Sequence, residues 1–283
     1  MGVRFVKNDY NHSTGIGVDP LEGQDISMAE ALREHTAAFY AFIDEVIDTH
    51  PGLMIENCGS GAMRCDHESL SHFHIQSTSD QEYYDRYPSI IQGMVACMPP
   101  ERAGIWAYPY PVDFHYMPEQ GDVFPLVGEN VKAVVESCAD GWQTAYNMVN
   151  GMMGAMYLSG RICYADELNK RLIADALAIY KDNRAVRAAA IPVYPMGLAR
   201  MSDDGHSSLG LLNREAGKLM LALWQTRTEA TEITLDLTSY LTDNASVTRT
   251  YPALDGFACS LNDGYLTVTF PAGNCAAYFD ITL

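Results

Sequence analysis

The chain has 283 residues, and 36 acidic against 18 basic residues give it a net charge of −18 at pH 7. This balance disfavours binding to nucleic acids, whose phosphate backbone requires clustered lysine and arginine. No apolar run reaches the roughly 18 residues that a membrane helix needs, and no secretory signal is recognisable. We therefore expect neither a nucleic-acid partner nor a membrane partner.

The cysteines indicate a reducing environment. Their number is odd and they form no CxxC pair, so they predict neither a disulfide framework nor a zinc site. Buried, reduced thiols in a cytoplasmic protein are the simplest interpretation. The seven are Cys58, Cys65, Cys97, Cys138, Cys163, Cys259 and Cys275.

The chain begins with the apolar run "VRFV", which leads into Lys7 and Asp9. The run predicts the end of a buried strand, and the two polar residues share one of its faces because side chains alternate with a period of two. The next stretch, residues 27–50, has apolar residues at helical spacing, and Ser27 is its expected N-cap. "GLMIENCGSG" at residues 52–61 then predicts a strand that enters a glycine turn.

The same alternation continues to about residue 185. Residues 73–80 predict a strand ending at Asp80, and residues 88–97 a helix. Further strands are expected within 103–111 and 150–160 and further helices over 131–149 and 165–183, with a polar loop at 111–128.

Strands that alternate with helices favour parallel βαβ units. Apolar strands that end in reactive side chains are typical of a (β/α)₈ TIM-type barrel, whose active site lies at the carboxyl ends of its strands. An open α/β sheet has the same property, but no GxGxxG motif follows the first strand. We therefore expect residues 1–204 to be the C-terminal portion of a barrel, about the last five of its eight units, in a truncated chain.

The residue composition of the chain changes after residue 204. Threonine, valine, leucine and aromatic residues form runs that are separated by "TDNA", "DG" and "AGN" turns. Such runs predict antiparallel strands. We expect residues 205–283 to form a small antiparallel β-sandwich domain.

Asp9 and Asp80 could be the two carboxyl groups that a retaining glycosidase requires. Around them, "KNDYN" (7–11), "IENCGSGAMRCD" (55–66) and "STSDQEYYDR" (77–86) resemble the signature blocks of glycoside hydrolase family 36, mainly α-galactosidases. The blocks come in the family's order and at its approximate spacing. The resemblance covers nearly the whole chain but only the later part of a family member, namely late barrel strands and a C-terminal β domain.

The resemblance implies roles for six residues. Asp9 would be the nucleophile and Asp80 the general acid/base. Lys7, Cys58, Gly61 and Arg64 would bind the sugar, with cysteine typical of galactose-selective members. The chain departs from the family where Asn8 replaces a tryptophan and where the block around Asp80 lacks an aromatic residue and an asparagine. These departures affect the preferred sugar more than the reaction.

The function implied is hydrolysis of terminal α-linked galactose from small oligosaccharides of the raffinose and melibiose type, without metal, nucleotide or organic cofactor. α-N-Acetylgalactosaminidase or another α-glycosidase specificity is the alternative within enzymes. A non-catalytic sugar-binding fragment is the alternative outside them. Half of a barrel would also expose apolar edges through which copies of the chain could form a homo-oligomer.

The residues themselves leave structural alternatives open. Asp9 could be a solvent-facing acid, and Asp80 could cap the helix that follows it. Glu56 is a rival carboxylate that we expect to pair with an arginine such as Arg64. His72 and His74 would share a strand face and could bind a metal, but a packed or surface pair is the better interpretation.

Overall fold

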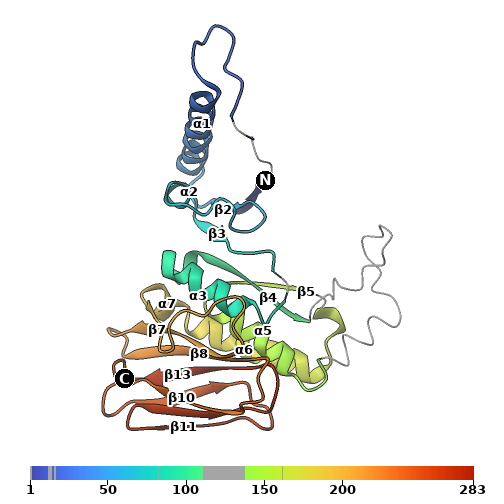
Figure 1. Ribbon diagram of the computed structural model, residues 1–283, viewed down its shortest axis with the longest axis vertical. Coiled ribbons are helices and arrows are strands. Elements are labelled where there is room, and N and C mark those ends of the chain that lie inside the picture. Colours follow the sequence, from blue (N-terminus) through green and yellow to red (C-terminus); the bar gives the residue numbers. More distant parts are fainter. Residues whose placement is uncertain (1, 12–14, 16, 82, 111–137, 161) are drawn as a thin grey trace. The chain divides into compact units, whose positions relative to one another are not determined.

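The computed structural model describes residues 2–11, 15, 17–81, 83–110, 138–160 and 162–283 (Figure 1). The chain divides into two compact units, Met1–Asp80 and Gln81–Leu283, which we call the first unit and the second unit. The division falls directly after Asp80. The domain boundary that the change in residue composition predicts, between residues 204 and 205, remains a prediction.

The first unit contains a parallel sheet in which β2 lies between β1 and β3. The register pairs Phe5 with Met54 and Asp9 with Cys58, and further along it pairs Glu56 with Ile75. A helix precedes β2, as the sequence predicts, and a short helix precedes β3. The elements are β1 (Phe5–Asp9), α1 (Met28–Thr49), β2 (Met54–Cys58), α2 (His67–His72) and β3 (Ile75–Ser77).

Helix α1 starts where its cap predicts. The Ser27 hydroxyl accepts a hydrogen bond from the backbone N–H of Glu30 at 3.2 Å, which satisfies one of the free donors of the first turn. Its apolar stripe buries Ile43 against Ile55 and Phe73, and this cluster is the core of the first unit. The helix therefore covers one face of the sheet through a small number of aliphatic and aromatic contacts.

Strand β1 is less buried than its apolar sequence predicts. Val3, Phe5 and Val6 are 59%, 45% and 39% exposed. Among the described residues of the first unit, β1 pairs only with β2, so its other edge has no neighbouring strand there. The expectation of a buried first strand is wrong for this structure, and the cause is the edge position.

The second unit begins with two further parallel strands, β4 and β5, which pair through Gly104–Ala155 to Ala107–Leu158. The expected loop at 111–128 and the start of the expected helix over 131–149 lie outside the described residues. Residues 138–141 are described but not helical, so the expected helix begins too early, and the helix starts at Trp142. The elements are α3 (Tyr87–Cys97), η1 (Pro100–Arg102), β4 (Ala103–Tyr110), α5 (Trp142–Met152), β5 (Ala155–Gly160), η3 (Ile162–Tyr164), α6 (Glu167–Asp182) and α7 (Arg184–Ala188).

Two antiparallel sheets complete the second unit, in the orders β10-β13-β8-β7-β6 and β11-β12-β9. One hydrophobic core joins them, with Leu221 of β8, Leu235 of β9 and Leu266 of β12 among its fully buried members. The strands are β6 (Ile191–Val193), β7 (Gly205–Asn213), β8 (Lys218–Thr226), β9 (Glu232–Asp236), β10 (Ser246–Tyr251), β11 (Ala258–Asn262), β12 (Tyr265–Thr269) and β13 (Cys275–Thr282). The expected change to antiparallel β-structure is confirmed.

Five parallel strands that alternate with helices, followed by antiparallel sheets, confirm the coarser part of the expected fold class. The TIM-type barrel and the sandwich remain predictions. Within the described part of the chain, no helix is both long enough and apolar enough to cross a membrane.

Candidate active site

The register of the first sheet gathers reactive side chains on one face. Lys7 pairs with Glu56 and Asp9 with Cys58, and residues that are paired in this way point to the same side of a sheet. Since the strands are parallel, Asp9 and Cys58 both stand at carboxyl ends. Lys7 and Asp9 are exposed, whereas Glu56 and Cys58 are each 1% exposed. The face thus has an accessible charged strand beside a buried one.

The Cys58 thiol lies at the centre of this group. Burial raises its pKa above the ordinary value, and donation of a hydrogen bond to the Asp9 carboxylate raises it further. The Ser77 hydroxyl, the backbone of Gly61 and the charge of Lys7 act in the opposite direction. The net effect is a neutral thiol near pH 7, which suits a hydrogen-bond donor beside Asp9 and not a nucleophile.

A tight turn follows β2 and contacts the end of β3. Ser60 and Gly61 both have positive φ angles, 46° and 78°, and the N–H of Gly59 donates to the carbonyl of Gly61 at 3.1 Å. A Cβ atom at Gly61 would come within 2.6 Å of the Ser79 Cα. Only glycine fits this approach, and it holds the turn against the residue that precedes Asp80.

Two buried amides join the ends of β2 and β3. Asn57 Nδ2 donates to Gln76 Oε1 at 2.7 Å and to the carbonyl of Arg64 at 2.9 Å. Gln76 Nε2 donates to the carbonyl of Ser77 at 2.8 Å. The bonds satisfy side chains that are 2% and 1% exposed, and they tie the glycine turn to the strand that leads to Asp80.

Arg64 holds the chain that follows Asp9. Its Nε donates to the carbonyl of Tyr10 at 3.0 Å, and its guanidinium group lies 4.0 Å from the centre of the Tyr10 ring. The neighbouring Asn11 Oδ1 accepts from the backbone N–H of Ser60 at 2.6 Å. These contacts connect the "KNDYN" block to the "ENCGSG" block.

Asp80 follows β3 and is exposed. The next helix, α3, begins at Tyr87 with Arg86 as its N-cap, so Asp80 does not cap it. That structural alternative is wrong because six residues separate the aspartate from the helix. A catalytic role for this carboxylate remains a prediction.

The two histidines occupy different environments. His72 is the last residue of α2, and its Nδ1 lies 2.9 Å from Asp44 Oδ1 while its ring stacks on Tyr40 at 4.5 Å. His74 precedes β3, and its Nδ1 accepts from the N–H of Ile55 at 3.1 Å. The expectation that both lie on one strand face is wrong, because the helix ends between them. No group of three or more potential metal-ligating side chains occurs among the described residues.

The structure therefore brings together Lys7, Asp9, Cys58 and Gly61, and it attaches Arg64 to the segment after Asp9. Sequence reasoning missed Asn11, Asn57, Ser77 and Gln76 as parts of this arrangement. Amides within otherwise apolar strands were the available signal for Asn57 and Gln76, because a buried polar group requires a partner.

The solved structures that match this chain agree on one fold. No protein-family model matches the chain, and no curated protein matches its sequence. Solved structures do match: a GH36 α-galactosidase from Geobacillus stearothermophilus in complex with 1-deoxygalactonojirimycin has a TM-score of 0.70 at 17% identity, covering 98% of this chain and 35% of that one. An α-galactosidase from Lactobacillus brevis has a TM-score of 0.67 at 14% identity, covering 99% and 35%.

The galactosidase domain of an α-galactosidase–sucrose kinase is also similar, with a TM-score of 0.65 at 15% identity and coverage of 99% and 34%. Other forms of the Geobacillus enzyme were solved with raffinose and with stachyose. The chain thus has the fold of about one third of these α-galactosidases, and the resemblance to family 36 is confirmed at the level of fold. It spans about a third of the length of the structures it matches.

Proposed function

We propose that this chain is part of a retaining α-galactoside hydrolase of glycoside hydrolase family 36, with Asp9 as nucleophile and Asp80 as general acid/base. The observation that carries the proposal is the position of Asp9. It is an exposed carboxylate at the carboxyl end of a parallel strand, with Lys7 on the same face and the Cys58 thiol beside it. The shared fold with α-galactosidases supports the substrate class.

The reaction proceeds by double displacement. In the first step the Asp9 carboxylate forms a bond to the anomeric carbon while the glycosidic C–O bond breaks, and its electron pair leaves on the aglycone oxygen. That oxygen takes the proton of Asp80. In the second step the Asp80 carboxylate removes a proton from water, which attacks the anomeric carbon and releases Asp9.

Each of the other residues has a physical task. The Lys7 ammonium group is a donor to sugar hydroxyls next to the nucleophile. The Cys58 thiol, neutral and buried, leaves space for a hydroxyl and donates a hydrogen bond toward Asp9. Gly61 and Arg64 hold the loops on either side of the sugar.

The exposed apolar side chains in β1 and just before it fit a larger assembly. Val3, Phe5 and Val6 would be covered in a closed (β/α)₈ barrel, to which the five parallel strands would contribute the later part. We propose accordingly that the active form contains further barrel strands, and that residues 205–283 form a β-sandwich domain of a cytoplasmic enzyme. Raffinose and melibiose are the model substrates.

The test is hydrolysis of p-nitrophenyl α-galactoside by this chain and by the longest polypeptide that its reading frame encodes. Asp9→Asn should reduce kcat by about 10³-fold or more, and NMR of the first product should show retained α-configuration. Asp48→Asn, which alters an exposed aspartate of α1, is the matched control and should keep full activity. Absence of hydrolysis with retained galactose binding would instead support a sugar-binding fragment, and preference for the N-acetylated substrate would support α-N-acetylgalactosaminidase.

A further inference from the structure

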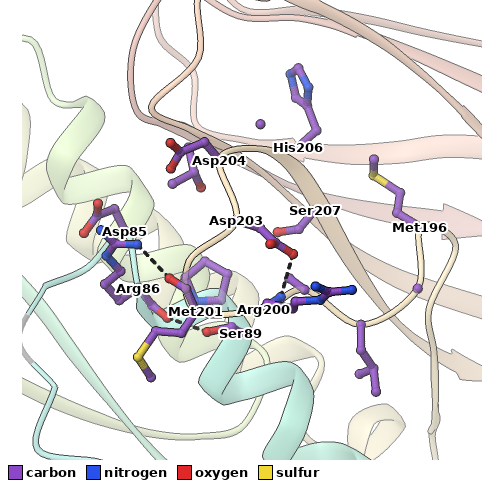
Figure 2. Close-up of a pocket in the computed structure, with 16 residues that line it drawn as sticks. Asp85, Arg86, Ser89, Met196, Arg200, Met201, Asp203, Asp204, His206 and Ser207 are labelled. Atoms are coloured by element: carbon purple, nitrogen blue, oxygen red, sulfur yellow. Dashed lines mark hydrogen bonds between the residues drawn. The ribbon is translucent and has the colours of Figure 1, made fainter.

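The carboxylates around a cavity of the second unit already have partners (Figure 2). The cavity has a volume of about 100 Å³, and Asp85, Asp203 and Asp204 are among the residues that line it. Arg227 forms ion pairs with Asp85 and Asp204, and Asp203 Oδ2 accepts a hydrogen bond from the backbone N–H of Arg200 at 2.9 Å. These contacts, all within the second unit, explain why the three carboxylates are there.

In the first unit, by contrast, one buried carboxylate has no task in the proposed mechanism. Glu56 lies in β2 and is 1% exposed. Burial of a charged carboxylate costs much free energy unless a cation or hydrogen bonds compensate for the lost water. The compensating group should lie on the face of the sheet to which Glu56 points.

The two faces of the first sheet have different neighbours. Ile55, next to Glu56 in β2, packs against Ile43 of α1 and Phe73. Because side chains alternate along a strand, Glu56 points to the face that α1 does not cover. The residue directly opposite Glu56 in β1 is Lys7, and Lys7 is the only basic residue within β1, β2 and β3.

Arg64, the cation that the sequence predicts beside Glu56, lies toward α1. Its guanidinium group is 4.0 Å from the centre of the Tyr10 ring, and that ring meets the ring of Phe39 in α1 at 6.1 Å. Arg64 and Phe39 also line a cavity of about 30 Å³. This placement favours Lys7 over Arg64 as the cation for Glu56.

Lys7 stands between two carboxylates. Asp9 follows it on the same strand and the same face, and Glu56 lies opposite it in the register. The charge of Lys7 also acts on the Cys58 thiol, where it opposes the rise in pKa that burial causes. Because a lysine side chain is a flexible four-carbon stem, its ammonium group needs a fixed counter-ion to keep one position.

We propose that Glu56 is a positioning residue that holds the Lys7 ammonium group beside the nucleophile, an inference that rests on the proposed function. With Glu56 as counter-ion, Lys7 stays directed at the sugar hydroxyls, and Asp9 keeps its charge for attack on the anomeric carbon. Without Glu56, the ammonium group pairs with Asp9, so the nucleophile is weaker and the sugar loses a donor. A displacement of about 1 Å can cost roughly 10²-fold in rate.

A double-mutant cycle on stability tests the pair without any activity. Lys7→Met should lower the urea midpoint of the first unit, because it leaves the buried Glu56 charge without its cation. Glu56→Gln, added to Lys7→Met, should raise the midpoint again because it removes that charge. The midpoints are measured on this chain by hydrogen exchange within the first unit. Glu45→Gln, which alters an exposed glutamate of α1, is the matched control and should shift neither background.

Activity then tests whether the pair serves the reaction. In the longest polypeptide that the reading frame encodes, Glu56→Gln should lower kcat/KM on raffinose about 10- to 100-fold. In the Lys7→Met background the same change should alter kcat/KM by less than about threefold, because the ammonium group is already absent. Glu45→Gln should leave kcat/KM unchanged in both backgrounds.

Three results would overturn the positioning role. They are an equal midpoint shift by Glu56→Gln in both backgrounds, an equal loss of kcat/KM in both, and an unchanged kcat/KM in the parent. Failure of the proposed function appears differently: the parent hydrolyses neither raffinose nor p-nitrophenyl α-galactoside, or Asp9→Asn remains active. The positioning role then falls with the proposed function, whatever the midpoints show.

Discussion

The first and second units differ in how they bury their side chains. The second unit has a continuous core to which β8, β9, β12 and β13 all contribute residues with 0–2% exposure. The first unit buries Ile43, Ile55 and Phe73 at 4–5% exposure, and it leaves the apolar side chains of β1 in solvent. Because hydrophobic burial is the main favourable contribution to folding, the second unit should be the more stable of the two.

The two units also differ in how far their charged groups are exposed to solvent. In the second unit Asp280, 1% exposed, accepts hydrogen bonds from Asn183 at 2.9 Å and Tyr278 at 2.8 Å and lies 3.0 Å from Lys218 Nζ. In the first unit the charged groups of Lys7 and Asp9 are open to solvent. The comparison teaches that the candidate site lies in the less tightly packed unit, where its charged groups are accessible.

The largest expected effect is the loss of a large side chain from the second core. Phe279→Ala should lower the free energy of unfolding of the second unit by about 3–5 kcal/mol, since Phe279 is 0% exposed. Phe73→Ala, its counterpart in the first unit, should cost less because partly buried neighbours can close the cavity. Urea unfolding, monitored by hydrogen exchange within each unit, measures both losses in the free energy of unfolding. A single transition that both variants shift equally would contradict the independent stability of the units.

A medium effect is expected where the first unit is tightly packed. Gly61→Ala combines a strained positive φ with a close approach of the new Cβ to Ser79, and it should destabilise the first unit by about 2–3 kcal/mol. Gly52→Ala is the matched control. Gly52 has a φ of 92° and open space around its Cβ position, so only the backbone cost of about 1 kcal/mol remains. Equal thermal shifts in both variants would show that the contact with Ser79 is unimportant.

The smallest effect concerns pH and the contact between α1 and α2. Hydrogen bonding to Asp44 raises the pKa of His72, and Glu68 raises it further. Protonated His72 should therefore stabilise the first unit fully below the unfolded pKa of about 6.5, and this stabilisation is lost as pH rises through the folded pKa. The effect should stay below about 1 kcal/mol.

The measurement is the Tm of the first unit between about pH 5 and pH 8, the range in which histidine titrates. Asp44→Asn should flatten the curve. His67→Gln alters an exposed histidine of α2, the helix that contains His72, and should leave the curve unchanged. A parent curve that is already flat would mean that the pair contributes nothing to folding.

Much of the fold follows from the sequence alone. The helical spacing of residues 27–50 with Ser27 as cap, the amphipathic stretch within 165–183 and the alternation of strands and helices all depend on local periodicity. The structure has each of them, as α1, α6 and the order β1 to β5. The sequence does not predict β6, β7 and β11 individually. They are strands because of their pairing, β7 with the following strand β8, β11 with the following strand β12 and β6 with β7, and strand propensity depends strongly on such context.

The sequence by itself determined the reactive residues and the face on which each pair stands, since strand alternation places Lys7 with Asp9 and Glu56 with Cys58. Only the tertiary structure decided the register that sets Asp9 beside Cys58, the approach of Gly61 to Ser79 and the attachment of Arg64 to Tyr10. It also decided that Asn274 and Arg227 contact Tyr84 and Asp85 within the second unit. These are contacts between residues far apart in the chain, and local periodicity carries no information about them.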